Sequence, residues 1–320
     1  MNGPEEGRIR LTVLGGYLGS GKTTWLRHQL HEGQFARARV IVNEAAETPV
    51  DHALLGQASG LCVLAGGCVC CVAKAELISV LRKLCDERTR ADAAGQRLDH
   101  IVLETSGLAD PGPIVAAIKS DPVLVYHIVV SEIIVAADAR HAMSQLRSEP
   151  LGRRQIEIAD RIIVTKVDEA EPAELTKLLS TLVSINPAAR ISGAVKGVET
   201  ALPSFEGVAP DALPDLNGQA LKPPVAPTRL QLDDSIDWTA FTIWLSALLH
   251  ARGDDIVRVK GVVRTPAGRL LLQTVRKVVQ TPEILPEQDG LGEDNMIVLI
   301  GRGFTQSQLA RSLRYFAGKR

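Results

Sequence analysis

The sequence predicts an α/β fold, a mostly parallel sheet with helices on both faces, followed by a small α+β domain. Two features predict it. Between Ile9 and about Ile191, short apolar runs alternate with helical patterns, which is typical of a parallel sheet. Residues 203–227 then contain six prolines in 25 residues, which indicates an extended linker. We therefore expect a first domain over residues 1–202, a linker over 203–227 and a C-terminal domain over 228–320.

Six short apolar runs are expected to form the strands of the first sheet. They are Ile9–Leu14, Val40–Asn43, Leu61–Leu64, Ile101–Glu104, Ile128–Ala137 and Ile162–Thr165. The longest helix expected among them covers Ala73–Glu87.

The C-terminal domain is expected to open with a helix over Trp238–His250, where apolar residues recur at helical spacing. Thr305 is expected to cap a final helix, because its hydroxyl can accept a hydrogen bond from the first free backbone amides. Three apolar runs between these helices are expected to be strands: Ile256–Arg264, Leu270–Val279 and Met296–Ile300.

The composition excludes several classes of protein. A formal net charge of −1 and 3% aromatic residues give neither a basic footprint for nucleic acid or an anionic membrane nor many platforms for stacking bases. The first residues contain no apolar secretion segment, and the longest apolar stretch, Val123–Ala137, falls short of the roughly 18 residues of a membrane span. Five cysteines, an odd number, fit reduced thiols. We therefore expect a cytoplasmic protein.

A phosphate-binding loop is predicted at GYLGSGKT, Gly16 to Thr23, which matches the spacing G-x4-G-K-[ST]. It follows the run Ile9–Leu14 and precedes a helical pattern, which is the strand–loop–helix context of a P-loop NTPase. Lys22 is expected to reach the β- and γ-phosphates, and the Thr23 hydroxyl to ligate magnesium. The alternative is a glycine-rich turn before a helix. The expected nucleotide contacts are Gly16, Gly19, Ser20, Gly21, Lys22, Thr23 and Thr24.

A second motif, IVLETSGLADP, covers Ile101 to Pro111. Glu104 ends the apolar run, at the edge where α/β folds carry their chemistry, and can hold magnesium through a water or orient an attacking water. Gly107 would let the backbone approach the γ-phosphate. The alternative is an ordinary acidic strand end. The residues expected to take part in catalysis are Lys22, Thr23 and Glu104.

A third motif, RIIVTKVDEA, places Lys166 and Asp168 after a strand. A carboxylate at Asp168 can accept two hydrogen bonds from the N1 and N2 edge of guanine, whereas adenine presents the wrong donor pattern. Lys166 can lay its methylene stem over the base or ribose. A Lys-x-Asp triplet alone is common by chance. Behind the two earlier motifs it predicts GTP rather than ATP.

A thiol cluster at Gly66–Cys71, GGCVCC, contains Cys68, Cys70 and Cys71. Thiolates favour zinc, copper(I) and similar ions over magnesium or calcium. Three thiolates leave a tetrahedral ion with one open position, which suits transfer of metal to a partner. The alternatives are buried core cysteines or a redox pair, and the core reading is the one expected for Cys62 and Cys85.

By these motifs the chain resembles the CobW-type metallochaperone GTPases, relatives of the nickel-insertion GTPases of urease and hydrogenase maturation. GGYLGSGKTT at Gly15–Thr24 is similar to the family's phosphate loop, GGCVCC to its Cys-x-Cys-Cys element and ETSGLADP to its second signature. QIEIADRIIVTKVD, Gln155 to Asp168, resembles the guanine-recognition stretch, and VRVKGVVRT with MIVLIGRGF resembles the family's C-terminal domain. The resemblance implies GTP hydrolysis coupled to carrying zinc, cobalt or iron toward a client protein.

Three departures from the family pattern stand out. Ala45-Ala46 replaces the usual Phe-Gly in the switch-like segment Val40–Leu55, between Glu44 and Glu47. Thr165 replaces the commoner Asn of the guanine motif, keeping a hydroxyl but losing an amide. The chain also lacks a histidine-rich tract, so a high-capacity metal reservoir is not expected.

The preferred hypothesis is a GTP-dependent metal carrier with slow intrinsic turnover. It would use magnesium with GTP or GDP, take zinc as its default cargo with cobalt or iron as options, and act on a client metalloprotein as a monomer or homodimer. The rival is a nucleotide-binding regulatory module with little turnover, in which the cysteines sense redox state. A small-molecule kinase is a third and more distant option.

Overall fold

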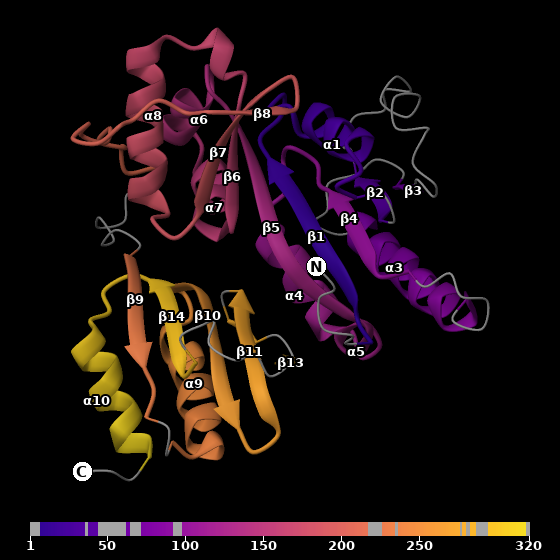
Figure 1. The fold of residues 1–320 in the computed structure, drawn as a ribbon, viewed down its shortest axis with the longest axis vertical. Helices are drawn as coiled ribbons and strands as arrows, with labels where there is room; N and C mark the ends of the chain where they lie inside the picture. The colour runs from indigo at the N-terminus through magenta and orange to yellow at the C-terminus, as the bar shows by residue number, and fades with distance from the viewer. Residues whose placement is uncertain are drawn as a thin grey trace. The chain divides into compact units, whose positions relative to one another are not determined.

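A computed structural model shows two compact units, one formed by residues 8–220 and the other by residues 1–7 and 221–320 (Figure 1). The division falls inside the proline-rich stretch 203–227. The predicted architecture, a mostly parallel α/β sheet followed by a small α+β unit, is confirmed. The structure describes residues 7–35, 38–43, 62–64, 72–91, 98–216, 226–233, 236–275, 277–279, 282–285 and 294–317.

The larger unit contains an eight-stranded sheet with the order β3-β2-β4-β1-β5-β6-β7-β8 (Figure 1). Neighbouring strands are parallel except β7 and β8, which pair antiparallel at one edge. The strands are β1 (Ile9–Gly16), β2 (Arg39–Asn43), β3 (Cys62–Leu64), β4 (His100–Glu104), β5 (Ile128–Asp138), β6 (Arg161–Thr165), β7 (Arg190–Val195) and β8 (Val198–Thr200).

Helices cover both faces of this sheet. Trp25 and Leu26 of α1 pack against Leu14 and Val102 on one face, together with further apolar residues of β2, β5 and β6. Helices α4 and α7 contact β5 from the other face. The helices are α1 (Lys22–His31), α3 (Val72–Ala91), α4 (Pro111–Ser120), α5 (Leu124–His127), α6 (Ala142–Ser148), α7 (Pro150–Ile158), η2 (Val167–Glu169) and α8 (Pro172–Ile185).

The strand register brings several polar residues to one edge of the sheet. Leu14 pairs with Glu104 between β1 and β4, and Asp138 pairs with Thr165 between β5 and β6. Because β1, β4, β5 and β6 are parallel, their carboxyl ends meet at the same edge. The phosphate loop, which begins where β1 ends at Gly16, lies at this edge as well.

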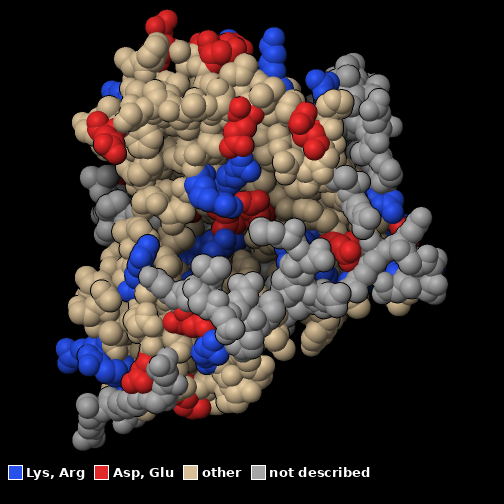
Figure 2. Space-filling view, viewed as in Figure 1, with Lys and Arg blue, Asp and Glu red and all other residues tan. Residues whose placement is uncertain are grey.

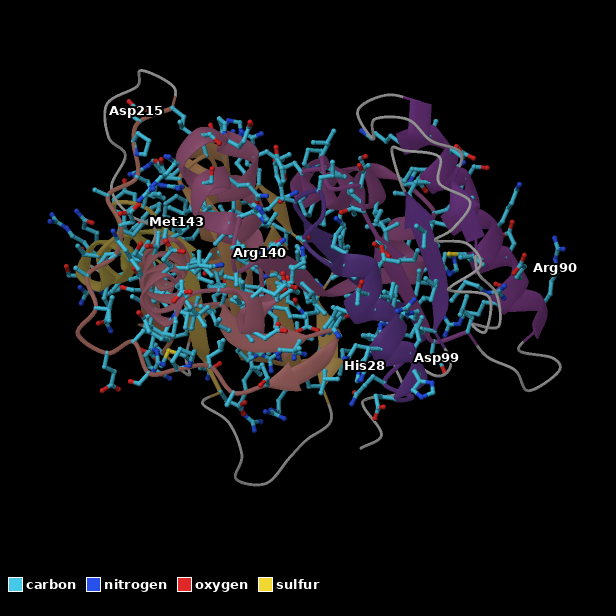
Figure 3. All side chains as sticks on the ribbon, turned by 90° about the horizontal axis from the view of Figure 1, so that it is seen from above. His28, Arg90, Asp99, Arg140, Met143 and Asp215 are labelled. Atoms are coloured by element: carbon cyan, nitrogen blue, oxygen red, sulfur yellow. The ribbon has the colours of Figure 1, made fainter. Side chains whose placement is uncertain are left out.

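Helix α3 starts at Val72 and runs to Ala91, four residues beyond the predicted end at Glu87. Its last turn carries Arg88 and Arg90, and cations there are favoured by the negative end of the helix dipole. Arg90 is exposed and points away from the unit (Figure 3). In the middle of the helix, Arg82 is paired with Asp121, which follows α4.

The smaller unit is an antiparallel sheet with α9 and α10 packed on one face. Phe241, Trp244 and Leu245 of α9 and Leu309 of α10 enter a common core with the sheet. Thr305 caps α10, as predicted, in a reciprocal capping box with Gln308. The strand order is β12-β11-β10-β14-β9, with β13 also pairing β11. The elements are β9 (Ala226–Gln231), α9 (Trp238–Arg252), β10 (Ile256–Thr265), β11 (Gly268–Val275), β12 (Val278–Val279), β13 (Glu283–Leu285), β14 (Met296–Gly301) and α10 (Gln306–Phe316).

Two details of the smaller unit differ from the prediction. The single strand expected at Leu270–Val279 is split into β11 and β12, because Val275 pairs with Val278 and the chain must reverse between them. Strand β9 was not predicted, and its first two residues, Ala226 and Pro227, fall inside the expected linker. Pro227 is tolerated because β9 is an edge strand of the sheet.

On the face shown in Figure 2, Lys and Arg side chains lie among Asp and Glu side chains. Among the described helices, none combines the length and the apolar character needed to cross a bilayer.

Candidate nucleotide site

The loop after β1 has the backbone of a phosphate cradle. Gly16 has φ +134°, and a Cβ there would lie 2.3 Å from the carbonyl oxygen of Ala136, so only glycine fits. Gly19 and Gly21 also have positive φ values, +73° and +81°. Gly21 is the N-cap of α1 and supplies no capping side chain, so the first amides of the helix, those of Lys22, Thr23 and Thr24, face the loop. Such amides and the helix dipole favour an anion.

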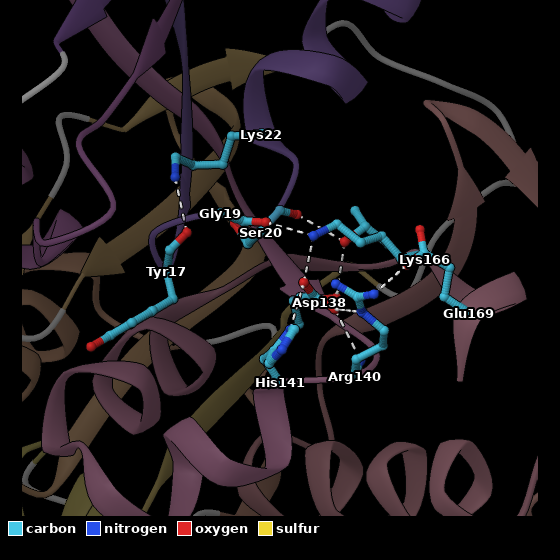
Figure 4. A network of polar contacts seen from close by, with 11 residues as sticks. Tyr17, Gly19, Ser20, Lys22, Asp138, Arg140, His141, Lys166 and Glu169 are labelled. Carbon is cyan, nitrogen blue, oxygen red and sulfur yellow. Dashed lines mark hydrogen bonds and ion pairs between the residues drawn. The ribbon is translucent and has the colours of Figure 1, made fainter. Parts of the chain in front are cut away.

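Lys22 lies within this cradle. Its Nζ donates hydrogen bonds to the carbonyl oxygens of Gly16, at 3.1 Å, and Tyr17, at 3.0 Å (Figure 4). The side chain is buried. The ammonium charge is therefore held over the loop, where it would meet a phosphate that entered the cradle.

Thr23 and Glu104 meet at the mouth of the loop. The Thr23 hydroxyl donates to Oε1 of Glu104 at 2.5 Å, although the two residues are 81 positions apart. Glu104 ends β4 and is fully buried. A hydroxyl and a carboxylate are the hard oxygen ligands that magnesium takes in nucleotide sites, so the donor set fits this ion.

The segment after Glu104 lies against the phosphate loop. The backbone N–H and the hydroxyl of Thr105 both donate to the carbonyl oxygen of Leu14, at 2.9 and 3.2 Å. A Cβ at Gly107 would lie 2.5 Å from the backbone nitrogen of Leu18. Gly107 thus permits a close backbone contact with the loop, and its contact with a γ-phosphate stays a prediction.

This segment also connects with two helices. Asp110 caps α4 by accepting from the Gly112 backbone N–H at 2.9 Å. The buried Gln155 of α7 donates its side-chain amide to the carbonyl oxygen of Ala109 at 2.7 Å, and the Nε of Arg154 lies 3.1 Å from Asp110. A movement of this segment would therefore alter its contacts with both α4 and α7.

The motif predicted to recognise the base follows β6 and adjoins the same loop. The Thr165 hydroxyl donates to the Ser20 carbonyl oxygen at 2.8 Å, and Ser20 itself is fully buried. Lys166, in a left-handed conformation with φ 55°, donates its Nζ to the carbonyl oxygen of Gly19 at 2.9 Å. Asp168 is exposed in η2, and its carboxylate has no partner among the described residues. The motif is therefore joined to the loop while Asp168 stays open to a ligand.

Both units match known families. Residues 10–192 match the family described as CobW/HypB/UreG, nucleotide-binding domain, and residues 226–317 match the cobalamin synthesis protein cobW C-terminal domain. The chain belongs to the CobW family. The resemblance found in its motifs is thereby confirmed, and the polar residues at the sheet edge lie within the matched nucleotide-binding domain.

Several characterised proteins are similar over nearly the whole chain. The zinc chaperone YjiA of Escherichia coli K12 is 31% identical over 98% of this chain and 99% of its own length. The zinc chaperone CobW of Pseudomonas aeruginosa is 30% identical over 96% of this chain and 91% of its own length. The crystal structure of Zn(II)-bound YjiA GTPase from E. coli has a TM-score of 0.60 at 23% identity, covering 98% and 100% of the two chains. This structural likeness indicates a shared fold.

The expected metal ligands lie outside the described residues of this CobW-family chain. This applies to Cys68, Cys70 and Cys71, and equally to the switch-like residues Glu44, Ala45, Ala46 and Glu47. Among the residues that the structure describes, no group of three His, Cys, Asp or Glu side chains is arranged for a metal ion. Cys85 is buried in α3, and this burial raises the pKa of its thiol to about 11. Cys85 is thus a core residue, as predicted.

The sequence motifs did not single out Asp138, the last residue of β5. Its buried carboxylate accepts from Lys166 Nζ at 2.5 Å and from the Arg140 backbone N–H at 2.9 Å, with His141 Nδ1 at 3.1 Å (Figure 4). Burial would raise the pKa of this carboxyl, but the hydrogen bonds outweigh it and hold the pKa below its ordinary value. The available signal was its position directly after an apolar run, at the edge that carries Glu104.

Proposed function

We propose that this CobW-family protein is a GTP-hydrolysing metallochaperone that binds zinc through Cys68, Cys70 and Cys71 and delivers it to a client protein. One observation carries the nucleotide part of this proposal. Thr23 and Glu104 form a 2.5 Å pair beside the phosphate cradle that holds Lys22. This is the set of groups that a magnesium-nucleotide enzyme needs at one point: a cation for the phosphates and hard oxygens for the metal.

In this proposal each group has a separate task. Lys22 and the amides of Thr23 and Thr24 bind the phosphates, and the Thr23 hydroxyl holds magnesium, which when bound neutralises phosphate charge. Glu104 holds the same ion through a water or orients the water that attacks the γ-phosphate. The proposal assigns no cationic side chain other than Lys22 to the charge of the transition state. Turnover is therefore expected to be slow, as in isolated GTPases.

Guanine selection is assigned to Asp168 and Lys166. The exposed carboxylate of Asp168 can accept from N1 and N2 of guanine, and no described residue competes for it. The Nζ of Lys166 donates to the carbonyl oxygen of Gly19, so its methylene stem extends from the turn after β6 to the phosphate loop. At the same edge adenine has the acceptor N1 and no amino group at C2. ATP would therefore leave the carboxylate without hydrogen-bond donors, which lowers its affinity.

Zinc as the cargo is supported by chemistry and by the relatives. Thiolates select zinc over hard ions, and a three-thiolate set leaves one position for a client ligand. The relatives from E. coli and P. aeruginosa, each similar over more than nine tenths of this chain, are named zinc chaperones. Cobalt(II) and iron(II) accept the same ligands and are the competing cargoes.

Coupling between the two sites is supported by a chain of contacts in the larger unit. Gly107 adjoins the phosphate loop, and Asp110, three residues later, caps α4. Asp121 follows α4 and pairs with Arg82 of α3 at 2.7 Å. Helix α3 begins at Val72, directly after Cys71. A shift of the segment around Gly107 on nucleotide exchange could thus be transmitted to the cysteines, with a coupling typically of about 1–3 kcal/mol.

A zinc competition titration of the apo, Mg-GDP and Mg-GTP-analogue forms tests the proposal. We expect zinc affinity to rise at least about tenfold with the GTP analogue, the lower part of the range for coupled sites, and to exceed cobalt(II) affinity. The variant Cys68→Ser/Cys70→Ser/Cys71→Ser should lose this zinc affinity while still binding GDP. The matched control is Cys85→Ala, which removes a buried thiol of raised pKa and should keep both properties.

Two outcomes would contradict the proposal. Equal zinc affinity in all three nucleotide states would mean that the sites are not coupled. A reversible disulfide among Cys68, Cys70 and Cys71 under mild oxidation, with no metal preference, would favour the redox-sensing regulatory module instead.

A further inference from the structure

A buried carboxylate, Asp138, lies at the nucleotide edge without belonging to any of the sequence motifs. It is 3% exposed and ends β5, between the phosphate loop on β1 and the base-recognition motif on β6. Burying a carboxylate destabilises the fold unless its oxygens are hydrogen-bonded. The oxygens of Asp138 are hydrogen-bonded to the ammonium of Lys166, the backbone N–H of Arg140 and the ring of His141. Asp138 is not among the residues expected to contact the phosphates or magnesium. Its hydrogen bonds therefore point to a role in holding Lys166.

Lys166 is fixed at two points by this arrangement. Its Nζ donates to the carbonyl oxygen of Gly19 at 2.9 Å and to Oδ2 of Asp138 at 2.5 Å (Figure 4). A free lysine samples many rotamers, and ordering them on binding costs affinity. Because both contacts are made within the protein itself, they restrict the rotamers of the Lys166 stem and reduce the cost of ordering it on binding.

The loop after Asp138 also reaches the turn that carries the guanine-reading carboxylate. The Arg140 backbone N–H donates to Asp138, and its side chain pairs with Glu169 at 2.6 Å. Glu169 is the neighbour of Asp168 in η2. Figure 4 shows Lys166, Arg140 and Glu169 grouped around Asp138.

We propose that Asp138 is a positioning residue for the nucleotide base, which holds the Lys166 stem in place for the purine plane. This inference rests on the proposed function, since it assigns a role within the GTP site. The expected change in nucleotide affinity is opposite in direction to the change that the charge of Asp138 alone would produce. Removing a negative charge near an anionic nucleotide would strengthen binding, whereas loss of the Lys166 anchor weakens it.

The test compares Asp138→Asn with wild type in Mg-GDP and Mg-IDP binding by calorimetry. IDP lacks the 2-amino group that Asp168 reads, while the purine plane is unchanged. We expect Asp138→Asn to weaken both nucleotides by the same factor, about tenfold, which is typical for the loss of a charge-assisted hydrogen bond. The preference for GDP over IDP should therefore stay at its wild-type value.

A double-mutant cycle with Lys166→Met shows whether Asp138 acts through Lys166. Lys166→Met keeps an apolar stem but has no ammonium to anchor. In this background Asp138→Asn should have no further effect on GDP affinity. The matched control is Asp211→Asn, which removes an aspartate paired with Arg147 and Lys177 and should leave GDP affinity unchanged.

The inference is overturned if Asp138→Asn binds GDP as tightly as wild type or more tightly, or if it weakens binding equally with and without the Lys166 ammonium. Asp138→Ser is made in parallel, so that the result does not depend on one variant folding. Wild-type protein that binds neither GDP nor GTP would instead refute the proposed function. Wild-type binding with guanine preference, unaffected by either Asp138 variant, would refute this inference alone.

Discussion

The Thr23 hydroxyl lies 2.5 Å from Oε1 of Glu104, so a residue at the start of α1 and a residue at the end of β4 form one oxygen pair. The pair exists because β1 and β4 are parallel neighbours, with Leu14 opposite Glu104. The loop after β1 and the end of β4 must then meet at one edge of the sheet.

Glu104→Gln should lower Mg-dependent GTP hydrolysis by about 10²-fold or more, since an amide cannot act on the attacking water or hold magnesium as a carboxylate does. GDP affinity should change far less. Single-turnover hydrolysis and calorimetric GDP binding, measured side by side, separate the two effects. The control is Glu132→Gln, which removes a carboxylate of β5 that is paired with Arg190 of β7, and it should change neither property.

Gly107→Ala should disturb the contact between the second motif and the phosphate loop. The new Cβ would lie 2.5 Å from the Leu18 nitrogen and 2.6 Å from its Cα, and backbone atoms there cannot swing aside as a side chain can. We expect a loss of about 1–3 kcal/mol in the free energy of unfolding, as for other overpacked sites, together with weaker GTP binding.

Gly152→Ala provides the comparison for Gly107→Ala. Gly152 lies in α7, and an added Cβ meets no atom closer than 3.9 Å. Urea unfolding should show unchanged or slightly raised stability for this variant, because alanine is the better helix former. Equal losses for both variants would contradict the packing argument.

Asp168→Asn should move nucleotide preference from GTP toward XTP. The side-chain amide can donate to the O2 of xanthine and its oxygen can accept from N1–H, while it no longer accepts two hydrogen bonds from guanine. Competition of GTP, XTP and ATP against a fluorescent nucleotide measures the change. Retained GTP preference would show that another group reads the base.

The Arg82–Asp121 pair should make the free energy of unfolding depend on pH in the acid range. Burial alone would raise the pKa of Asp121, but hydrogen bonds from Arg82 and from the backbone N–H groups of Leu124 and Val123 lower it. With a lowered folded-state pKa, the stabilisation is fully present above the unfolded pKa of about 3.9 and is lost as pH falls through the folded value.

Asp121→Asn checks this sign. At pH 7 we expect it to unfold at lower urea than wild type, by about 1–2 kcal/mol for the lost charged hydrogen bonds. The difference should shrink as pH falls below 4, where the wild-type carboxyl becomes protonated. A difference that stays constant between pH 7 and pH 2.5 would show that Asp121 stabilises the fold in some other way.

Cys85 should be chemically inert at neutral pH. Its thiol pKa of about 11 leaves roughly a hundredfold less thiolate than an ordinary thiol with a pKa of 9.0. Mass spectrometry after brief alkylation of the folded protein at pH 7.5 should find Cys85 unmodified, and modification should appear on unfolding. Fast labelling of Cys85 in the native protein would contradict its placement in the core.

The parts of the site that are carried by motifs could be predicted from the sequence, because the spacing of Lys22, Thr23 and Glu104 reflects local backbone geometry at strand ends. Asp138 could not be found in this way. A single aspartate after an apolar run has no partner in the sequence, and its meaning comes from Lys166, which lies 28 residues further on. Thr165 is an intermediate case, since the sequence shows that a hydroxyl is kept in the motif, whereas its hydrogen bond to the Ser20 carbonyl oxygen follows only from the fold.

The fold shows the same limit. The six strands expected in the larger unit were found, because each is a run of apolar residues that pairs with a parallel neighbour. Strand β8 has only three residues and carries no apolar run, so its pairing depends on the two-residue turn at Lys196 and Gly197, both with positive φ. In the smaller unit, the split between β11 and β12 likewise depends on a chain reversal that hydropathy does not record.

Helix α3 can act as a lever with a pivot part-way along it. Arg82, held by Asp121, lies ten residues from the helix start at Val72, which corresponds to about 15 Å along the axis. A tilt of about 5° around this pivot would displace the helix start by roughly 1.3 Å at that rise per residue. Metal–ligand distances tolerate only about 0.2 Å. In the proposed metal carrier, such a rotation would therefore be large enough to separate a thiolate of Cys68, Cys70 or Cys71 from its ion.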